Sequence, residues 1–517
     1  MSFSHPLPVL IVGAGPSGLA LALSLVQHGV QVRIIDRDQQ FHIGQRGAGI
    51  QPRTLEAWNL LGVLPDILSK SMGLLPMRFY KLPGGVEPAK TIDLITPEDP
   101  TPDTPYIHAQ LLGQAKTEQI LREHLAKYGC HVERGTELLS LEQNGSHVVA
   151  HLVKRSGDEE ANESVVSRWL VGTDGARGTV RKQLGLTFLG ESLSGKFVFG
   201  EIVVKNLSRD CSHNWGSFES GMWDILHDPY QAYSLSTPNV RMVNKFSEGR
   251  VFVAGDAAHV HSPVGGQGMN SSVQDSLNLG WKLALVERGL APESLLDTYT
   301  EERLPVIAHM LKQTTNLFKT TRNAMANGED ASKAWARPRD LKMLGVNYRW
   351  SSIVLDERHP REASEKDMQL LDAYGADTSG GLHAGDRAPD APGLAVVEEG
   401  NVSTETTSLF RIFDSAHHTV LIFSSDGSQI AAVLKATKKL PPRLIRTVVI
   451  YPRDSSPSLA VSGADVVCVD RDGYGHSGYG ASPDGTTVSI VRPDGIVGAL
   501  VSGEAGLEAY FRNVFLG

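Results

Sequence analysis

"LPVLIVGAGPSGLALALSLV" runs from Leu7 to Val26, and the alternating "VQVRIID" that follows it ends at Asp36. The stretch opens with a short apolar run, and the residues after its glycines place apolar side chains at helical spacing. The alternating run then predicts a second strand. The whole segment therefore predicts a strand, a helix and a strand, which is a βαβ unit.

Gly13, Gly15 and Gly18 have the GxGxxG spacing between the first strand and the helix. The first glycine permits a tight turn, the second lets a pyrophosphate approach the backbone, and the third brings helix and strand together. The helix N-terminus then faces the phosphates, and Asp36 can bind ribose hydroxyls. A plain turn is the alternative interpretation. The context favours a dinucleotide, and this segment alone leaves NAD and FAD both open.

A second glycine-rich loop, "GDAAHVHSPVGGQGMN", covers residues 255–270 between the strand-like "RVFVA" and an amphipathic helix. Two such loops, more than two hundred residues apart, suit a ligand long enough to cross the domain. Asp256 would accept hydrogen bonds from a ribityl chain, and the helix starting near Met269 would point its amides at a ring carbonyl. A reduced flavin gains negative charge there, which a helix N-terminus stabilises. The loop therefore predicts FAD.

His259 and His261 in this loop also suggest a metal, because an HxH pair on a strand can face one ion. No carboxylate or third histidine accompanies them at a suitable spacing in the sequence. We expect loop packing for both residues and no metal site.

Length and composition favour a globular protein of several domains and argue against a nucleic-acid-binding or membrane-spanning one. A chain of 517 residues is too long for one core and predicts two or three domains. The net charge of −9 without a Lys/Arg stripe argues against nucleic acid as a partner. The three cysteines form no CxxC, which favours a reducing, cytoplasmic location. No segment has the length and apolarity of a membrane span, so none is expected.

Three segments together resemble the class A flavoprotein aromatic hydroxylases of the phenol hydroxylase and 4-hydroxybenzoate hydroxylase type. They are the N-terminal GxGxxG, "GTDGARGTVRKQLG" at residues 172–185, and "RVFVAGDAAHVHSPVGGQGMN". The resemblance implies an FAD-dependent monooxygenase that hydroxylates a phenolic or fused aromatic substrate with NAD(P)H and O2, through a flavin C4a-hydroperoxide. It also implies non-covalent FAD. The alternatives are a flavin oxidase or dehydrogenase, or an FAD-binding protein with defective or uncoupled activity.

The motifs and the resemblance together predict a set of site residues. The cofactor-binding candidates are Gly13, Gly15, Gly18, Asp36, Arg37, Arg46, Gln114, Asp174, Gly175, Gly255, Asp256, Gly268, Met269 and Asn270. The resemblance places Pro263 at the flavin edge where oxygen reacts. The aromatic candidates for the substrate pocket are Trp223, Tyr230 and Tyr233, with Trp215 nearby, although such residues are more often core. Asp174 also suits a helix cap.

The expected fold class is α/β with three parts. Residues 1–186 and 249–355 form a Rossmann-like FAD-binding domain, residues 187–248 form a small β-rich substrate domain, and residues 356–384 form a linker. Residues 385–517, which include "GDRAPDAPGL", resemble the thioredoxin-like tail of the phenol hydroxylase subgroup and have no CxxC. We expect this tail to be a separate domain, dispensable for FAD binding, with a role in packing or in a homodimer.

The middle of the chain departs from the family pattern. Asp256 follows Asp174 by 82 positions (256 − 174), which is shorter than the family usually has between these two motifs. The shortfall lies near "WDILHDPYQAYSLSTPNVRMV". We therefore expect either a reduced substrate domain or a sequence from which a segment of this domain is missing.

Overall fold

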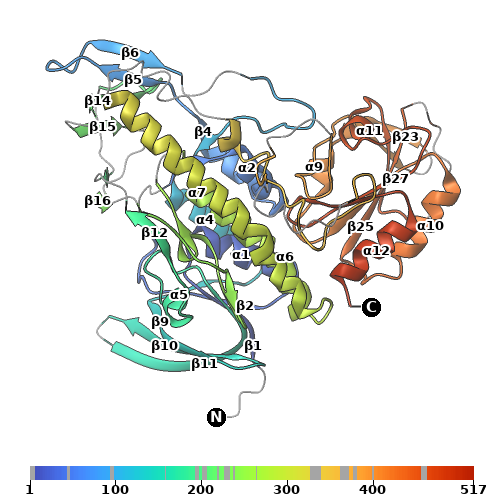
Figure 1. The fold of residues 1–517 in the computed structure, drawn as a ribbon, viewed down its shortest axis with the longest axis horizontal. Coiled ribbons are helices and arrows are strands. Elements are labelled where there is room, and N and C mark those ends of the chain that lie inside the picture. The colour runs from blue at the N-terminus through green and yellow to red at the C-terminus, as the bar shows by residue number, and fades with distance from the viewer. Residues whose placement is uncertain are drawn as a thin grey trace.

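The computed structural model describes residues 6–516 except for 44–46, 94–97, 158, 193–196, 201–205, 218–220, 226–232, 237–238, 263–264, 327–338, 361–371, 376–380, 399–400, 454 and 456–462. Two lobes lie side by side, and the long helix α7 (Asp297–Ala326) crosses the larger one (Figure 1). Among the helices described, none has both the length and the apolar character to cross a membrane.

The larger lobe is built on the predicted βαβ unit. Strand β1 (Leu7–Val12) leads into helix α1 (Pro16–Gln27) and strand β2 (Val32–Asp36), so this prediction is confirmed. The sheet continues on both sides in the order β18-β19-β11-β1-β2-β8, and β10 and β9 extend it from β11. The remaining strands are β8 (Val132–Arg134), β9 (Thr136–Gln143), β10 (Val148–Ser156), β11 (Glu159–Gly172), β18 (Ser247–Glu248) and β19 (Val251–Val253).

Helix α1 packs between α4 (Gln114–Ala126) and α6 (Gly268–Glu287). Small residues bring α1 and α6 together: a Cβ added at Gly280 would lie 2.4 Å from the Ser24 Oγ. A proline inside a helical segment predicts a kink, and α7 continues through Pro305 as one helix. Shorter elements of this lobe are α2 (Pro52–Leu60), α3 (Leu64–Lys70), α5 (Thr179–Gln183), β3 (Gly49–Ile50), β4 (Met72–Gly73) and β7 (Gln110–Leu111).

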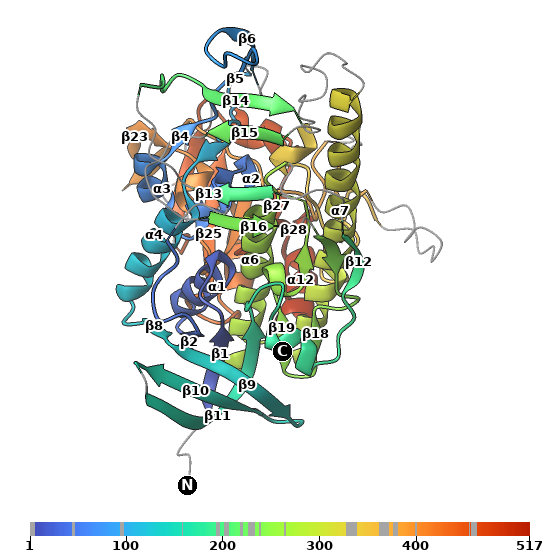
Figure 2. The same ribbon diagram turned by 90° about the vertical axis from the view of Figure 1, so that its left-hand side faces the viewer.

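Short sheets cover one side of this lobe (Figure 2). One has the order β15-β14-β5-β6, another β12-β17-β20, and a third pairs β13 with β16. The expected substrate region, 187–248, therefore supplies only part of these sheets, because β5 and β6 precede it and β20 follows it. The strands are β5 (Met77–Tyr80), β6 (Pro88–Ile92), β12 (Leu189–Ser192), β13 (Phe197–Gly200), β14 (Ser212–Ser217), β15 (Gly221–Ile225), β16 (Tyr233–Ser236), β17 (Asn239–Met242) and β20 (His259–Val260).

The smaller lobe is one mixed sheet with the order β21-β28-β27-β24-β25-β26-β22-β23. The Asp494–Gly495 pair between two apolar runs predicts a hairpin, and this prediction is confirmed because β27 and β28 pair antiparallel around it. The sheet begins at β21, which spans the expected boundary between residue 355 of the FAD-binding domain and residue 356 of the linker. Its elements are β21 (Leu355–Asp356), β22 (Leu394–Glu398), β23 (Asn401–Thr407), α9 (Leu409–Ile412), β24 (His418–Phe423), α10 (Gly427–Thr437), β25 (Ile445–Tyr451), β26 (Val466–Asp470), α11 (Tyr474–Gly478), β27 (Thr487–Val491), β28 (Val497–Val501) and α12 (Glu504–Val514).

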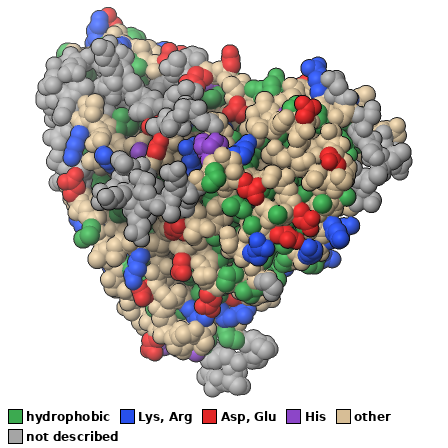
Figure 3. All heavy atoms as spheres, turned by 45° about the vertical axis from the view of Figure 1, so that its right-hand side comes forward, with side chains coloured by type: hydrophobic (Ala, Val, Ile, Leu, Met, Phe, Trp, Pro, Cys, Tyr) green, Lys and Arg blue, Asp and Glu red, His purple; other side chains and the backbone are tan. Residues whose placement is uncertain are grey.

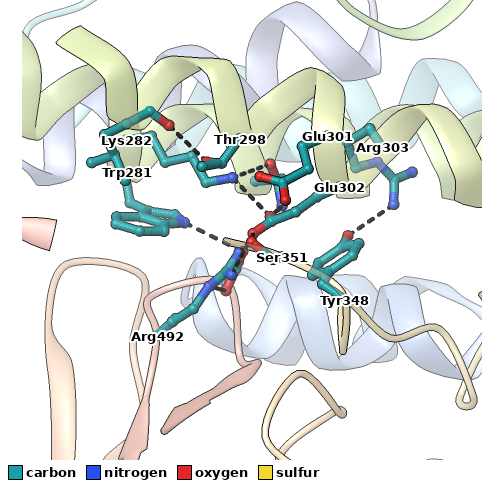
Figure 4. A network of polar contacts seen from close by, with 12 residues as sticks. Trp281, Lys282, Thr298, Glu301, Glu302, Arg303, Tyr348, Ser351 and Arg492 are labelled. Atoms are coloured by element: carbon teal, nitrogen blue, oxygen red, sulfur yellow. Dashed lines mark hydrogen bonds and ion pairs between the residues drawn. The ribbon is translucent and has the colours of Figure 1, made fainter. Parts of the chain in front are cut away.

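A buried ionic cluster joins the two lobes (Figure 4). Arg492, in the β27–β28 hairpin, donates to both carboxylate oxygens of Glu302 on α7, at 2.8 and 2.9 Å. Lys282 on α6 donates to the same carboxylate at 2.7 Å, and all three side chains are fully buried. Burial lowers the pKa of Lys282 to about 8. Burial opposes ionisation of Glu302 as well, but Arg492 and Lys282 outweigh it and hold the Glu302 pKa below its ordinary value.

Candidate functional site

The three sequence motifs meet at one edge of the large sheet. Strands β1, β11 and β19 are parallel neighbours, and a motif residue follows the end of each strand by one or two positions. The loops are those of Gly13, Asp174 and Gly255, and Asp36 ends the next parallel strand, β2. Ligands of open α/β sheets bind outside the carboxyl ends of such strands. The sheet thus brings together residues that are more than two hundred positions apart.

The glycines of the first motif have different surroundings. Gly13 has a φ of 106°, and a Cβ there would lie 2.4 Å from the Thr173 carbonyl oxygen. At Gly18 a Cβ would lie 2.1 Å from the Gly13 carbonyl oxygen. At Gly15 it would meet no described atom within 4 Å. Gly13 and Gly18 therefore allow the backbone to pack, whereas Gly15 leaves open space at the N-terminus of α1, where a pyrophosphate fits.

Asp36 shapes the turn it faces. One carboxylate oxygen accepts a hydrogen bond from the Ala14 amide at 2.8 Å, and the other accepts from the Asp38 amide at 2.9 Å. The neighbouring Arg37 is exposed, and its Nε lies 3.9 Å from the Asp38 carboxylate. The carboxylate of Asp36 is thus fixed at the mouth of the first loop.

Asp174 and Gly175 follow β11. The Asp174 carboxylate accepts a hydrogen bond from the Val180 amide at 3.0 Å, so it caps α5 as the alternative interpretation anticipated. Its other oxygen is buried without a hydrogen-bond partner among the described residues. Burial raises the pKa of this carboxyl despite the backbone amides that favour its charged form.

The third motif packs directly against the first. Gly255 has a φ of 61°, and a Cβ there would lie 2.9 Å from the Ser272 Oγ and 3.0 Å from the Ser17 Oγ. Ser17 belongs to the first motif and Ser272 to the first turns of α6. Asp256, the next residue, is exposed. The turn therefore directs Asp256 out of the packed region.

Behind this turn lies Asp275, which the sequence analysis did not single out. One of its oxygens accepts from the Gly255 amide at 3.0 Å and lies 2.7 Å from the His259 Nε2, and the other accepts from the Arg303 Nε at 2.7 Å. Burial would raise the pKa of Asp275, but His259 and Arg303 hold it below its ordinary value. Sequence spacing gave no sign of this carboxylate beside His259, because α6 brings Asp275 back across 16 positions.

His261 lies apart from this group. Its Nδ1 lies 2.6 Å from the Ser262 carbonyl oxygen, and a Cβ at Gly268 would lie 2.7 Å from its Nε2. Burial lowers its pKa. His259 and His261 thus pack within the loop on different partners.

The start of α6 meets two distant segments. A Cβ at Gly47 would lie 3.9 Å from the Met269 Cβ and 4.0 Å from the Gln114 Oε1. Asn270 is fully buried, and its side chain donates to the Gly49 carbonyl at 2.9 Å and accepts from the Gln51 amide at 2.8 Å. Its amide group therefore holds residues 49–51 in place, a connection that sequence spacing could not reveal.

Several predicted positions cannot be placed. Arg46, Pro263 and Tyr230 lie outside the described residues, as do the side chains of Trp223 in β15 and Tyr233 in β16.

Trp215 is half-buried in an aromatic cluster of the β15-β14-β5-β6 sheet. It donates from its indole nitrogen to the Gly85 carbonyl at 2.8 Å and stacks on Tyr80, with ring centroids 4.9 Å apart. The Tyr80 hydroxyl lies 2.6 Å from the His213 Nδ1. Tyr80 was not among the candidates, because it lies before the expected substrate region.

Comparison with known proteins agrees with this arrangement. The FAD binding domain family model matches residues 6–221 and 219–314. A flavin-dependent monooxygenase of Mycobacteroides abscessus is 34% identical over 512 residues, covering 90% of this chain and 96% of the relative. A pentachlorophenol 4-monooxygenase of Sphingobium chlorophenolicum is 27% identical, covering 97% and 94%. The crystal structure of the flavin-dependent monooxygenase PieE with FAD and substrate superposes with a TM-score of 0.75 at 22% identity, covering 99% of this chain and 100% of that one.

This chain lacks residues that one of these relatives has. The alignment with the pentachlorophenol enzyme extends over 557 residues, whereas this chain has 517. It therefore contains at least 40 positions (557 − 517) at which the relative has a residue and this chain has none.

Proposed function

Because the chain belongs to the class A flavoprotein aromatic hydroxylases, a family of FAD-dependent monooxygenases, we propose that the motif edge of the large sheet is its FAD site. This proposal is carried by the observation that the three loops follow adjacent parallel strands and that Asp36 ends the next one. The pyrophosphate would lie over Gly15 at the N-terminus of α1, the adenosine ribose at Asp36, and the ribityl chain at Asp256. The flavin ring would lie toward the start of α6.

The residues present fit this cofactor. Gly15 leaves room where phosphates need to approach amides, and the exposed Asp256 follows a turn fixed by Asp275. FAD, when bound, takes up hydride from NAD(P)H and, once reduced, activates O2 for transfer of one oxygen atom to an aromatic ring. The chain contributes the positioning. The N-terminus of α6 stabilises negative charge at the ring, and the short sheets exclude water from the reacting atoms.

We propose a phenolic or fused aromatic substrate, held between the flavin and the short sheets. Trp223, Tyr230 and Tyr233 remain our candidates for its walls, with Pro263 at the flavin edge. Trp215 and Tyr80 support the outer sheet instead, because they stack on one another. The reduced length between Asp174 and Asp256 supports a substrate domain with fewer strands than the relatives have.

For the smaller lobe we propose a thioredoxin-like module. Parallel strands β24 and β25 flank α10, and an antiparallel hairpin and a final helix follow, as in that fold. Its one cysteine, Cys468, is buried, and burial raises its thiol pKa to about 12. The module thus has a packing role and no dithiol chemistry.

The decisive experiment combines cofactor and product analysis. Purified protein should release one FAD per chain on acid precipitation. With NAD(P)H and a panel of phenols, label from 18O2 should enter the product, and peroxide measured alongside gives the coupling. Incorporation of no label with any aromatic compound would contradict the monooxygenase assignment for these substrates.

Asp256→Ala tests the cofactor position independently of turnover. Loss of a charge-assisted hydrogen bond of about 1.5 to 3 kcal/mol should weaken FAD binding roughly tenfold or more. The matched control is Asp484→Ala, an exposed turn aspartate in the smaller lobe. Equal FAD affinity in both variants would show that Asp256 does not face the cofactor.

A further inference from the structure

Two histidines and an aspartate converge where the chain enters the smaller lobe. Asp356 ends β21, His359 follows in the same turn, and His383 lies 24 positions after His359 (383 − 359). Each offers one ligand atom, and these atoms lie within 4.8 Å of one another. The site is outside every motif discussed above, and sequence spacing did not suggest it.

The carboxylate is held rigidly. One oxygen of Asp356 accepts from the amides of Arg358 and His359 at 3.0 and 3.1 Å, and the other accepts from the Ala384 amide at 2.8 Å. The last bond connects the turn to the segment that carries His383. Such fixation of a carboxylate by outer hydrogen bonds is typical of metal ligands.

The two imidazoles are placed for a shared ion. The His359 Nδ1 lies 3.6 Å from the Asp356 Oδ2, which is long for a hydrogen bond. Two ligands of one tetrahedral Zn²⁺, with bonds of about 2.0 to 2.1 Å, lie roughly 3.4 Å apart. The rings of His359 and His383 have centroids 4.2 Å apart, and in the described part of the chain neither ring donates or accepts a hydrogen bond.

Neighbouring cations do not occupy the cluster. Arg349 is paired with Asp386 through two contacts of 2.6 and 3.0 Å. Arg358 donates to the carbonyls of Tyr479 and Leu382. His359 is exposed, so it can turn toward an ion that arrives from solvent. Figure 3 shows a group of histidine side chains near the centre of one face, flanked by Lys or Arg side chains.

We propose that Asp356, His359 and His383 form a binding site for a first-row divalent cation, with Zn²⁺ as its best occupant. Two imidazoles and a carboxylate suit this class, and a water completes the tetrahedron. The ion clips the turn after β21 to the segment that begins at His383. Its role is structural, because the ligands come from the boundary of the smaller lobe rather than from the cofactor loops.

Zinc titration of the FAD-loaded protein, chelator-treated and without a polyhistidine tag, tests the proposal. Calorimetry should give one site per chain with a dissociation constant in the micromolar range or below. His359→Ala and His383→Ala should each weaken binding at least tenfold. The matched control, His151→Ala, removes a histidine 3.5 Å from Glu142 and should leave binding unchanged.

Two further measurements keep the result unambiguous. Thermal midpoints in chelator should be equal for wild type and the histidine variants, which shows that all are folded. Zinc should then raise the midpoint of the wild type alone. Absence of a saturable site, or equal affinity in the wild type and a His359→Ala/His383→Ala double variant, would overturn the proposal.

Discussion

Single glycines in the first motif perform separable tasks. A side chain at Gly18 collides with the Gly13 carbonyl and the Thr173 hydroxyl, whereas a side chain at Gly15 enters open space. Gly15 also has an ordinary extended backbone, with φ −73° and ψ −177°, which any residue adopts. Cofactor binding and folding can therefore be tested one residue at a time.

Gly15→Val should abolish FAD retention in a folded protein. The isopropyl group would fill the space between the α1 amides and a pyrophosphate, so FAD affinity should fall at least tenfold. The free energy of unfolding of the apoprotein should change by no more than about 1 kcal/mol.

Gly18→Ala is the control, because its Cβ forces the backbone apart. It should lower the free energy of unfolding by about 3 kcal/mol. Fluorescence titration with FAD and denaturant unfolding of the apoproteins measure the two effects. Normal FAD binding by Gly15→Val would show that the pyrophosphate does not bind at this turn.

Buried His28 should make the protein sensitive to acid. Burial lowers its pKa to about 4, while its Nδ1 donates to the Ser24 carbonyl at 2.8 Å. Between pH 6.5 and 4 the imidazole of His28 is protonated in the unfolded chain and remains neutral in the folded chain. Protonation of His28 therefore does not affect the free energy of unfolding above pH 6.5. Below that pH it lowers the free energy of unfolding progressively, by about 3 kcal/mol in total as the pH falls to 4.

His28→Gln should flatten the loss of stability between pH 6.5 and 4, measured by denaturant unfolding at each pH. The slope should not vanish, because burial also lowers the pKa of His418. His131→Gln, at an exposed position, should leave the profile unchanged. Identical profiles for wild type and His28→Gln would contradict the assignment.

A residue of the smaller lobe helps to neutralise a buried carboxylate between helices α6 and α7. Lys282 and Glu302 face each other across the two helices, and Arg492 supplies the second cation that the Glu302 carboxylate contacts. Removing one member of a buried ion cluster leaves an uncompensated charge. The helices that carry Asp275 and Arg303 toward the cofactor loops are thus held by a residue of the last sheet.

Arg492→Met should lower the free energy of unfolding by about 3 to 5 kcal/mol. Lys81→Met is the control, because its ion pair with Glu87 is solvent-exposed and should be worth no more than about 1 kcal/mol. Chemical denaturation of both variants measures the difference. Equal losses would show that the cluster contributes no more than a surface pair.

The sequence predicted local elements well and contacts between distant elements poorly. The strands and helix around Gly13, the helix beginning near Met269 and the hairpin at Asp494 follow from apolar periodicity and glycine positions, which are local. The partners of Arg492 could not be predicted, because Glu302 lies 190 positions away. In the sequence, a charged residue beside a turn gives no sign that the structure buries it. The pairing of β5 with β14 was missed for the same reason.

The smaller lobe is its own sheet, yet the whole molecule should unfold as a unit. Sequence alone suggested that residues 385–517 could be removed without loss of FAD. The structure places Arg492 and Asp494 of this segment among buried groups of α6 and α7. Their removal would expose Trp281 and take away the guanidinium that donates to both carboxylate oxygens of Glu302.

We therefore expect a chain ending at residue 384 to be mostly insoluble or depleted of FAD. The full chain should show one thermal transition, with flavin release and loss of tertiary circular dichroism at the same temperature. A soluble truncated chain with full FAD content and an unchanged midpoint would show that the ionic cluster is dispensable.

The mixed origin of the sheet β15-β14-β5-β6 limits how this protein can be recombined with its relatives. β14 pairs in parallel with β5, more than 130 positions earlier in the chain. A chimaera that exchanges residues 187–248 alone would set a foreign β14 against the native β5 and break the stacking of Trp215 on Tyr80. To transfer the substrate preference of a relative, residues 77–92 must therefore be exchanged together with the middle region.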